Sequence, residues 1–131
     1  MATVLVVEDN PDELQICSAV LYYNGFDVIE ASTGEAALEL ARKHRPAVIL
    51  MDVRLPGLDG LLVSEILKAG DDTSEIPIVC VTAYDIEPRR AHTAGLQGVL
   101  RKPVPPEVLV KKVRTLADGS GPRNPPMLTP G

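Results

Sequence analysis

The sequence predicts an open, doubly wound α/β fold, and three observations support this prediction. Short apolar runs alternate with helical patterns five times within the first 118 residues. Three of these runs are almost continuously apolar, as expected for strands that are buried on both faces of a parallel sheet. A closed eight-stranded α/β barrel needs about twice this length of chain. We therefore expect five parallel strands with helices on both faces of the sheet.

The five expected strands are short and rich in β-branched residues. Right-handed crossovers between them favour the flavodoxin-like strand order 2-1-3-4-5. The strands are expected at Thr3–Val7, Phe26–Glu30, Ala47–Met51, Ile78–Thr82 and, with a weaker pattern, Gly98–Arg101.

The first two helices have clear capping signals. Asn10 precedes Pro11 and two acidic residues, which favours a helix start, and Gly25 is expected to end this helix. Residues 32–35 (STGE) have the spacing of a capping box. They predict a second helix that runs to about Lys43.

Three further helices are expected in the second half of the chain. Asp59 can cap a helix that ends at Gly70, and a shorter pattern predicts a helix over Asp85–Ala94. The last helix is expected to begin at Pro106.

Residues 1–118 thus form one expected domain. Seven of the thirteen residues 119–131 are Gly or Pro, which predicts a disordered tail.

Composition excludes several classes of protein. The net charge is −5, and the chain has three Tyr, one Phe and no Trp, which argues against a nucleic-acid partner. No apolar stretch approaches the length of a membrane helix, and no signal peptide is expected. Cys17 and Cys80 lie in no metal-binding or disulfide spacing, which indicates a reducing compartment. The cytoplasm is the expected location.

Polar residues follow the strands at one edge of the predicted sheet. Strand 1 ends at Glu8 and Asp9, strand 3 at Asp52, strand 4 at Thr82 and strand 5 at Lys102. Ligands of such sheets bind outside the carboxyl ends of the strands. Two like charges about 4 Å apart repel by about 4 kcal/mol at an effective dielectric constant near 20. Either the acids stay partly protonated or a cation joins them. A divalent cation is the simpler solution, and Mg²⁺ suits a site of few carboxylates and several waters.

Asp52 is the expected nucleophile of this site. A carboxylate beside a metal ion and an amine is placed to attack phosphorus and form an aspartyl phosphate. Lys102 can neutralise the charge of the phosphoryl oxygens, and Thr82 can donate a hydrogen bond to one of them.

These residues resemble the receiver domain of two-component response regulators over residues 3–118. The matching segments are VLVVEDN at 4–10, DVRLPGLDG at 52–60, VTA at 81–83 and KP at 102–103. The resemblance implies that Asp52 is the phosphoacceptor, and that Glu8 and Asp9 hold Mg²⁺ together with the backbone carbonyl of Arg54. It also implies that Thr82 is the switch hydroxyl, that Lys102 contacts the phosphoryl group, and that the Lys102–Pro103 peptide is cis.

Two positions depart from the family pattern. Val99 stands where the family usually has Tyr or Phe, and Val104 stands where Phe usually follows the KP pair. The aromatic residue that reports phosphorylation to the output face is therefore missing. Tyr84 is the nearest aromatic residue that can substitute for it.

The main hypothesis is a stand-alone receiver rather than an enzyme with an external substrate. The resemblance implies a histidine kinase or a histidine phosphotransfer protein as donor, an unknown downstream protein partner, and a monomer or weak homodimer. An alternative is a phosphorylation-independent interaction module on the same fold. A phosphatase of the haloacid dehalogenase type is disfavoured, because its DxD motif is replaced by Glu8-Asp9-Asn10.

Overall fold

The computed structural model describes residues 2–118, and its centre is one parallel sheet of five strands. The strand order is β2-β1-β3-β4-β5, as the sequence predicts. The strands are β1 (Thr3–Val7), β2 (Asp27–Ala31), β3 (Val48–Met51), β4 (Ile78–Thr82) and β5 (Gly98–Arg101).

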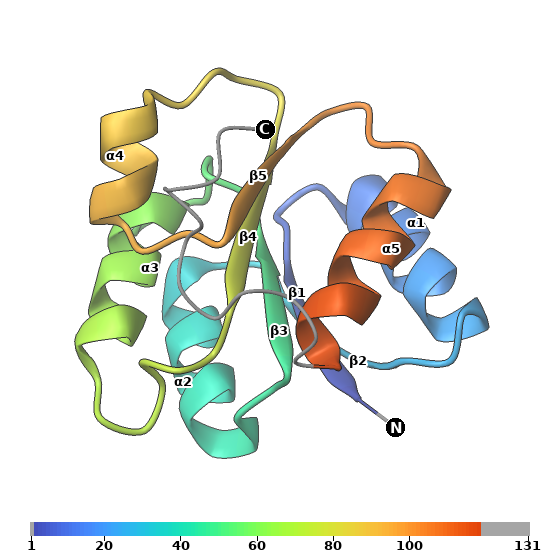
Figure 1. Ribbon diagram of the computed structural model, residues 1–131, viewed down its shortest axis with the longest axis horizontal. Coiled ribbons are helices and arrows are strands. Elements are labelled where there is room, and N and C mark those ends of the chain that lie inside the picture. The colour runs from blue at the N-terminus through green and yellow to red at the C-terminus, as the bar shows by residue number, and fades with distance from the viewer. Residues whose placement is uncertain (1, 119–131) are drawn as a thin grey trace.

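Five helices cover the two faces of the sheet. Figure 1 shows α1 and α5 on one face and α2, α3 and α4 on the other, which confirms the doubly wound architecture. The helices are α1 (Pro11–Tyr23), α2 (Gly34–His44), α3 (Gly60–Ala69), α4 (Pro88–Thr93) and α5 (Pro106–Ala117).

The sheet separates two apolar cores. Side chains of a strand alternate between its two faces, so β1 contributes to both cores. Leu5 and Val7 pack in the core under α2 and α3, whereas Val4 and Val6 pack in the core under α1 and α5. This burial on both faces explains why the central strands are almost entirely apolar.

Several element boundaries differ from the sequence prediction. β2 begins at Asp27, because the Phe26 N–H donates to the Leu21 carbonyl oxygen and the Phe26 ring is buried against the end of α1. β3 begins at Val48 rather than Ala47. The N-cap of α2 is Thr33 and not Ser32, since Thr33 Oγ1 accepts the Ala36 N–H at 3.1 Å.

Helix α4 is shorter than expected. It begins at Pro88 instead of Asp85, because proline is favoured at the first helical position. None of its six residues is buried, so little apolar packing supports a longer helix.

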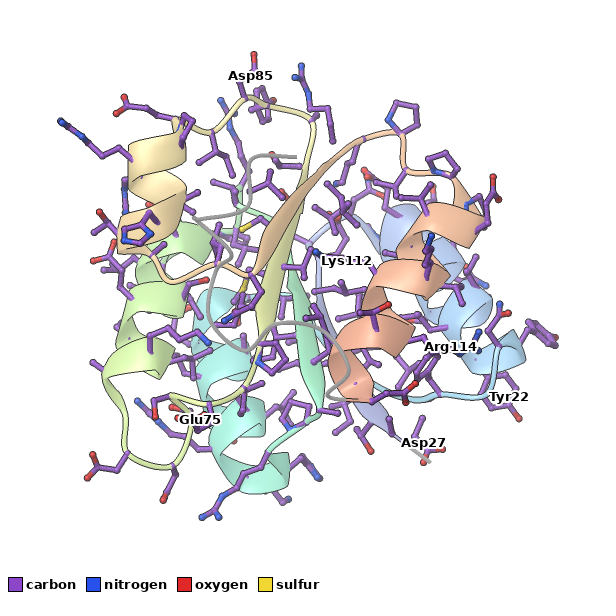
Figure 2. The ribbon with its side chains drawn as sticks, in the orientation of Figure 1. Tyr22, Asp27, Glu75, Asp85, Lys112 and Arg114 are labelled. Atoms are coloured by element: carbon purple, nitrogen blue, oxygen red, sulfur yellow. The ribbon has the colours of Figure 1, made fainter. Side chains whose placement is uncertain are left out.

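The carboxyl ends of all five strands lie at one end of the molecule. In Figure 2, Asp85 marks this end, on the loop after β4, and Asp27 and Glu75 lie at the opposite end. Within residues 2–118, no helix is long and apolar enough to cross a membrane. The tail predicted at 119–131 lies outside the described residues.

Candidate functional site

The ammonium group of Lys102 lies at the centre of the site, among three carboxylates. Its Nζ atom is 2.8 Å from Glu8 Oε1, 3.1 Å from Asp52 Oδ2 and 2.7 Å from Glu13 Oε1. Glu8 and Asp52 are buried, and Lys102 is largely shielded from solvent. Residues from the ends of β1, β3 and β5 thus meet at one point.

Glu8, Asp52 and Lys102 each donate a backbone hydrogen bond that continues the sheet beyond the end of a strand. The acceptors are backbone carbonyl oxygens. The Glu8 N–H donates to that of Ala31 at 3.0 Å, the Asp52 N–H to that of Val7 at 3.0 Å, and the Lys102 N–H to that of Thr82 at 2.8 Å. The backbone of the site therefore has the rigidity of the sheet, although the residues follow the strands.

The segment after Asp52 turns tightly around its side chain. The Arg54 N–H donates to Asp52 Oδ1 at 3.2 Å, and the Gly60 N–H donates to the Val53 carbonyl oxygen at 2.8 Å. A Cβ atom at Gly60 would lie only 2.2 Å from the Asp52 carbonyl oxygen. Glycine at this position lets the first turn of α3 pack directly against the backbone of Asp52.

Burial and hydrogen bonding shift the pKa of Glu8 in opposite directions. Desolvation raises the pKa of Glu8 most, while hydrogen bonds from Lys102 and the Asn10 backbone N–H lower it. Repulsion from Asp52 adds to the rise, and the net pKa of Glu8 lies above its ordinary value. The carboxylates thus repel one another, as the sequence predicts.

Lys102 shows the complementary effect. Burial lowers the pKa of Lys102, but hydrogen bonds to Glu13, Glu8 and Asp52 outweigh this contribution and raise it well above its ordinary value. The side chain is therefore a cation at neutral pH.

Glu13 is a member of the site that sequence reasoning missed. The sequence assigns Glu13 only a favourable interaction with the α1 dipole. The signal that points to it is its place in the sequence: Glu13 lies in the first turn of α1, five residues after Glu8.

Thr82 lies at the end of β4 and is fully buried. Its Oγ1 atom accepts the Tyr84 N–H at 3.1 Å. The guanidinium carbon of Arg54 lies 4.2 Å from the centre of the Tyr84 ring, which is a cation–π contact. The structure therefore links the segments after β3 and β4.

Three carboxylates are close enough to share a metal ion. Glu8, Asp9 and Asp52 each offer one oxygen, and these oxygens all lie within 4.8 Å of one another. A donor set made only of oxygens suits Mg²⁺. The residues present therefore fit the metal ion that the sequence predicts at this edge of the sheet.

An apolar groove lies beside the charged site, between α1 and α5. Its volume is about 510 Å³. Ile16, Cys17 and Val20 line it from α1, and Val104 and Leu109 line it from the other side. Glu13 and Lys102 also line this groove, so their ion pair belongs to both the groove and the charged site.

The doubly wound fold carries an acidic pocket and a lysine at the carboxyl ends of its strands. The profile of the response regulator receiver domain matches residues 4–114. The chain belongs to this family, whose members act in two-component signalling and bind Mg²⁺ in the acidic pocket.

Two curated relatives support this membership. The chain is 36% identical over 121 residues to protein PilH of Pseudomonas aeruginosa, with 91% of this chain and 100% of PilH covered. It is 36% identical over 104 residues to the polar-differentiation response regulator DivK of Brucella anthropi, with 78% and 85% covered.

Solved structures show the same architecture. The chemotaxis response regulator CheY4 of Vibrio cholerae has a TM-score of 0.83 at 30% identity, with 88% of this chain and 98% of CheY4 covered. The receiver domain of the sensor histidine kinase PA1611 of Pseudomonas aeruginosa has a TM-score of 0.82 at 30% identity, with 89% and 98% covered. The latter structure holds a magnesium ion in its active site cleft.

The remaining sequence expectations concern the surroundings of the site. The Lys102–Pro103 peptide is cis, as the resemblance implies. Val99 is 40% exposed on the edge strand β5 and occupies the position where the family usually has an aromatic residue. Tyr84 is exposed, and its ring lies against the guanidinium group of Arg54.

Proposed function

We propose that this chain is a receiver that takes a phosphoryl group onto Asp52 from a phosphohistidine of a histidine kinase or a histidine phosphotransfer protein. The observation that carries the proposal is the position of the Lys102 ammonium, 3.1 Å from Asp52 Oδ2 at the buried end of the acidic pocket. An aspartate paired with a lysine beside a cation site is suited to accept a phosphoryl group.

The proposed step is a displacement at phosphorus. A carboxylate oxygen of Asp52 forms a bond to phosphorus while the bond from phosphorus to the donor imidazole nitrogen breaks. The electron pair of the broken bond stays on the imidazole, which takes a proton from water. The product is an acyl phosphate on Asp52 and a free histidine.

Each neighbouring residue has a proposed role in this step. Glu8, Asp9 and Asp52, with the Arg54 carbonyl, would hold Mg²⁺, which supplies positive charge to the phosphoryl oxygens when bound. Lys102 would neutralise a phosphoryl oxygen. The Thr82 hydroxyl already accepts the Tyr84 N–H, so its own hydrogen is available for donation to the phosphoryl group.

The proposal extends to signalling. Phosphorylation of Asp52 would change binding to a downstream protein or let the chain pass the phosphoryl group on. This assignment fits a cytoplasmic protein whose action is on its own aspartate, without turnover of an external substrate.

The test is phosphoryl uptake by the full chain. Incubation with acetyl phosphate and Mg²⁺ should add the mass of one phosphoryl group, located at Asp52 by peptide mapping. Asp52→Asn should take up none, while Asp71→Asn, an exposed acid in the turn after α3, should behave as the wild type. Equal labelling of the Asp52→Asn chain would show that the acceptor has been assigned wrongly.

The missing aromatic residue on β5 supports one alternative, an interaction module that does not depend on phosphorylation. Val99 is exposed and small for an output switch. A partner isolated with the phosphorylated wild type should bind Asp52→Asn more weakly by at least about tenfold. Equal affinity for both forms would favour the module instead.

A further inference from the structure

The three contacts of Lys102 differ in how easily they can be exchanged. The side chains of Glu8 and Asp52 are 9% and 11% exposed, whereas that of Glu13 is 46% exposed. If a contact to Lys102 is lost, water can hydrate the Glu13 carboxylate, but it has little access to the other two. Glu13 is therefore the partner that Lys102 can release at the lowest cost in free energy.

Three carboxylate oxygens crowd the ammonium group of Lys102. Nζ donates hydrogen bonds to Glu8 and Asp52 and forms a close ion pair with Glu13, and all three oxygens lie within 3.1 Å. The distance to Glu13, 2.7 Å, is shorter than the 3.1 Å to Asp52. A phosphoryl oxygen that binds Lys102 must therefore displace one of the three.

The local structure of α1 leaves Glu13 free to make this contact. Glu13 is the third residue of α1, where a glutamate commonly reaches back to the backbone N–H of the N-cap. Here the Asn10 N–H instead donates to Glu8 Oε2 at 3.1 Å. The Glu13 side chain consequently extends across to Lys102 and joins α1 to the end of β5.

We infer that Glu13 is a positioning residue for phosphoryl transfer: it occupies the place on Lys102 that a phosphoryl oxygen takes over. This inference rests on the proposed function. When the phosphoryl group arrives, Lys102 exchanges the Glu13 carboxylate for a phosphoryl oxygen. Glu13, which lines the groove between α1 and α5 and is 46% exposed, is then hydrated as a free carboxylate.

The inference predicts faster uptake when this competition is removed. Glu13→Gln keeps the size of the side chain but removes its charge, so one Lys102 donor is held less strongly. Uptake from acetyl phosphate with Mg²⁺ should accelerate by about fivefold, the scale of a partly exposed ion pair. Asp12→Asn removes the same charge from the same helical turn, but Asp12 is not among the carboxylates on Lys102; its rate should stay within about twofold of the wild type.

The same substitution in a chain without Lys102 shows whether Glu13 acts through Lys102 or only through its negative charge. In Lys102→Met, the additional change Glu13→Gln should alter the uptake rate by less than about twofold. The same acceleration in both backgrounds would mean that Glu13 acts by its charge alone. Unchanged or slower uptake by Glu13→Gln in the wild-type background would overturn the exchange.

A measurement without metal or phosphoryl donor tests the contact itself. In the metal-free full chain, the NMR signal of the Lys102 Cε methylene should shift in Glu13→Gln and stay in place in Asp12→Asn. A stationary signal in Glu13→Gln refutes the positioning role, whatever the uptake rates. A second outcome is that the signal shifts in Glu13→Gln but the wild type takes up no phosphoryl group. This outcome supports the contact between Glu13 and Lys102, and it refutes the proposed function and with it the exchange.

Discussion

Arg101 and Ala83 are joined across the end of the sheet, where Arg101 Nε donates to the Ala83 carbonyl oxygen at 2.9 Å. The same guanidinium group pairs with Asp85. Ala83 directly follows Thr82, so this contact holds the start of the loop between β4 and α4. Residues 83–85 are exposed, so this part of the loop depends on such polar contacts more than on apolar packing.

Arg101→Ala should loosen this loop without unfolding the protein. The Arg101 side chain is 55% exposed, so the free energy of unfolding should fall by less than about 1 kcal/mol. Backbone amides of residues 83–87 should exchange hydrogen faster, as followed by mass spectrometry. Arg45→Ala, which removes an exposed ion pair with Asp72, should leave the exchange of this loop unchanged. Equal protection of the loop in both variants would contradict the role of Arg101.

Gly60→Ala should destabilise the fold next to Asp52. The added Cβ atom would lie 2.2 Å from the Asp52 carbonyl oxygen, so α3 or the Asp52 backbone must shift. We expect a loss of about 2 kcal/mol in the free energy of unfolding, measured with urea, as for other overpacked sites. Leu62→Ala changes an exposed residue in the same helix and should cost less than about 1 kcal/mol. If Gly60→Ala unfolds at the same urea concentration as the wild type, the packing of α3 against the Asp52 backbone is not tight.

Mg²⁺ should stabilise the folded chain, because its proposed ligands come together only on folding. At a free concentration about 100 times the dissociation constant, a ligand specific for the native state adds about 2.7 kcal/mol. The melting temperature should therefore rise with added Mg²⁺ and return to its initial value with a chelator. Asp9→Asn should remove most of this rise, whereas Glu39→Gln on α2 should retain it. A full Mg²⁺ effect in Asp9→Asn would exclude Asp9 as a ligand.

Stability should fall at alkaline pH because of Cys80. Burial is the main cause that raises the pKa of Cys80 from 9.0 to about 12, with further contributions from Asp52 and Asp59. Between these values the unfolded chain loses the thiol proton and the folded chain keeps it, so the unfolded state gains stability as pH rises. At about pH 10.5 the free energy of unfolding should therefore be about 2 kcal/mol lower than at neutral pH.

The corresponding experiment compares urea unfolding at neutral and alkaline pH for the wild type and Cys80→Val. The variant should show a shallower loss of stability, since it has no thiol to ionise at this position. In the native wild type at neutral pH, Cys80 should also resist alkylation until urea is added. A pH dependence that is the same in both chains would assign the loss to other groups.

Much of the fold follows from local patterns in the sequence. The apolar runs that form β1 and β4 have the observed boundaries, and Asn10 and Asp59 are the observed N-caps. These predictions succeed because hydrophobic periodicity and capping act within a few residues. The start of β2 is missed because it depends on packing of Phe26 against α1, and the length of α4 because it depends on burial.

For the candidate site, too, some features follow from the sequence and others depend on the tertiary structure. The sequence by itself determined that Glu8, Asp9, Asp52 and Lys102 reach one edge, because parallel strands end at the same side of a sheet and the motifs follow the strands. Only the tertiary structure decided that Lys102 lies among three carboxylates and that Glu13 is one of them. Hydrogen-bond partners depend on distances of a few tenths of an ångström between segments far apart in the chain, and no local pattern encodes those distances.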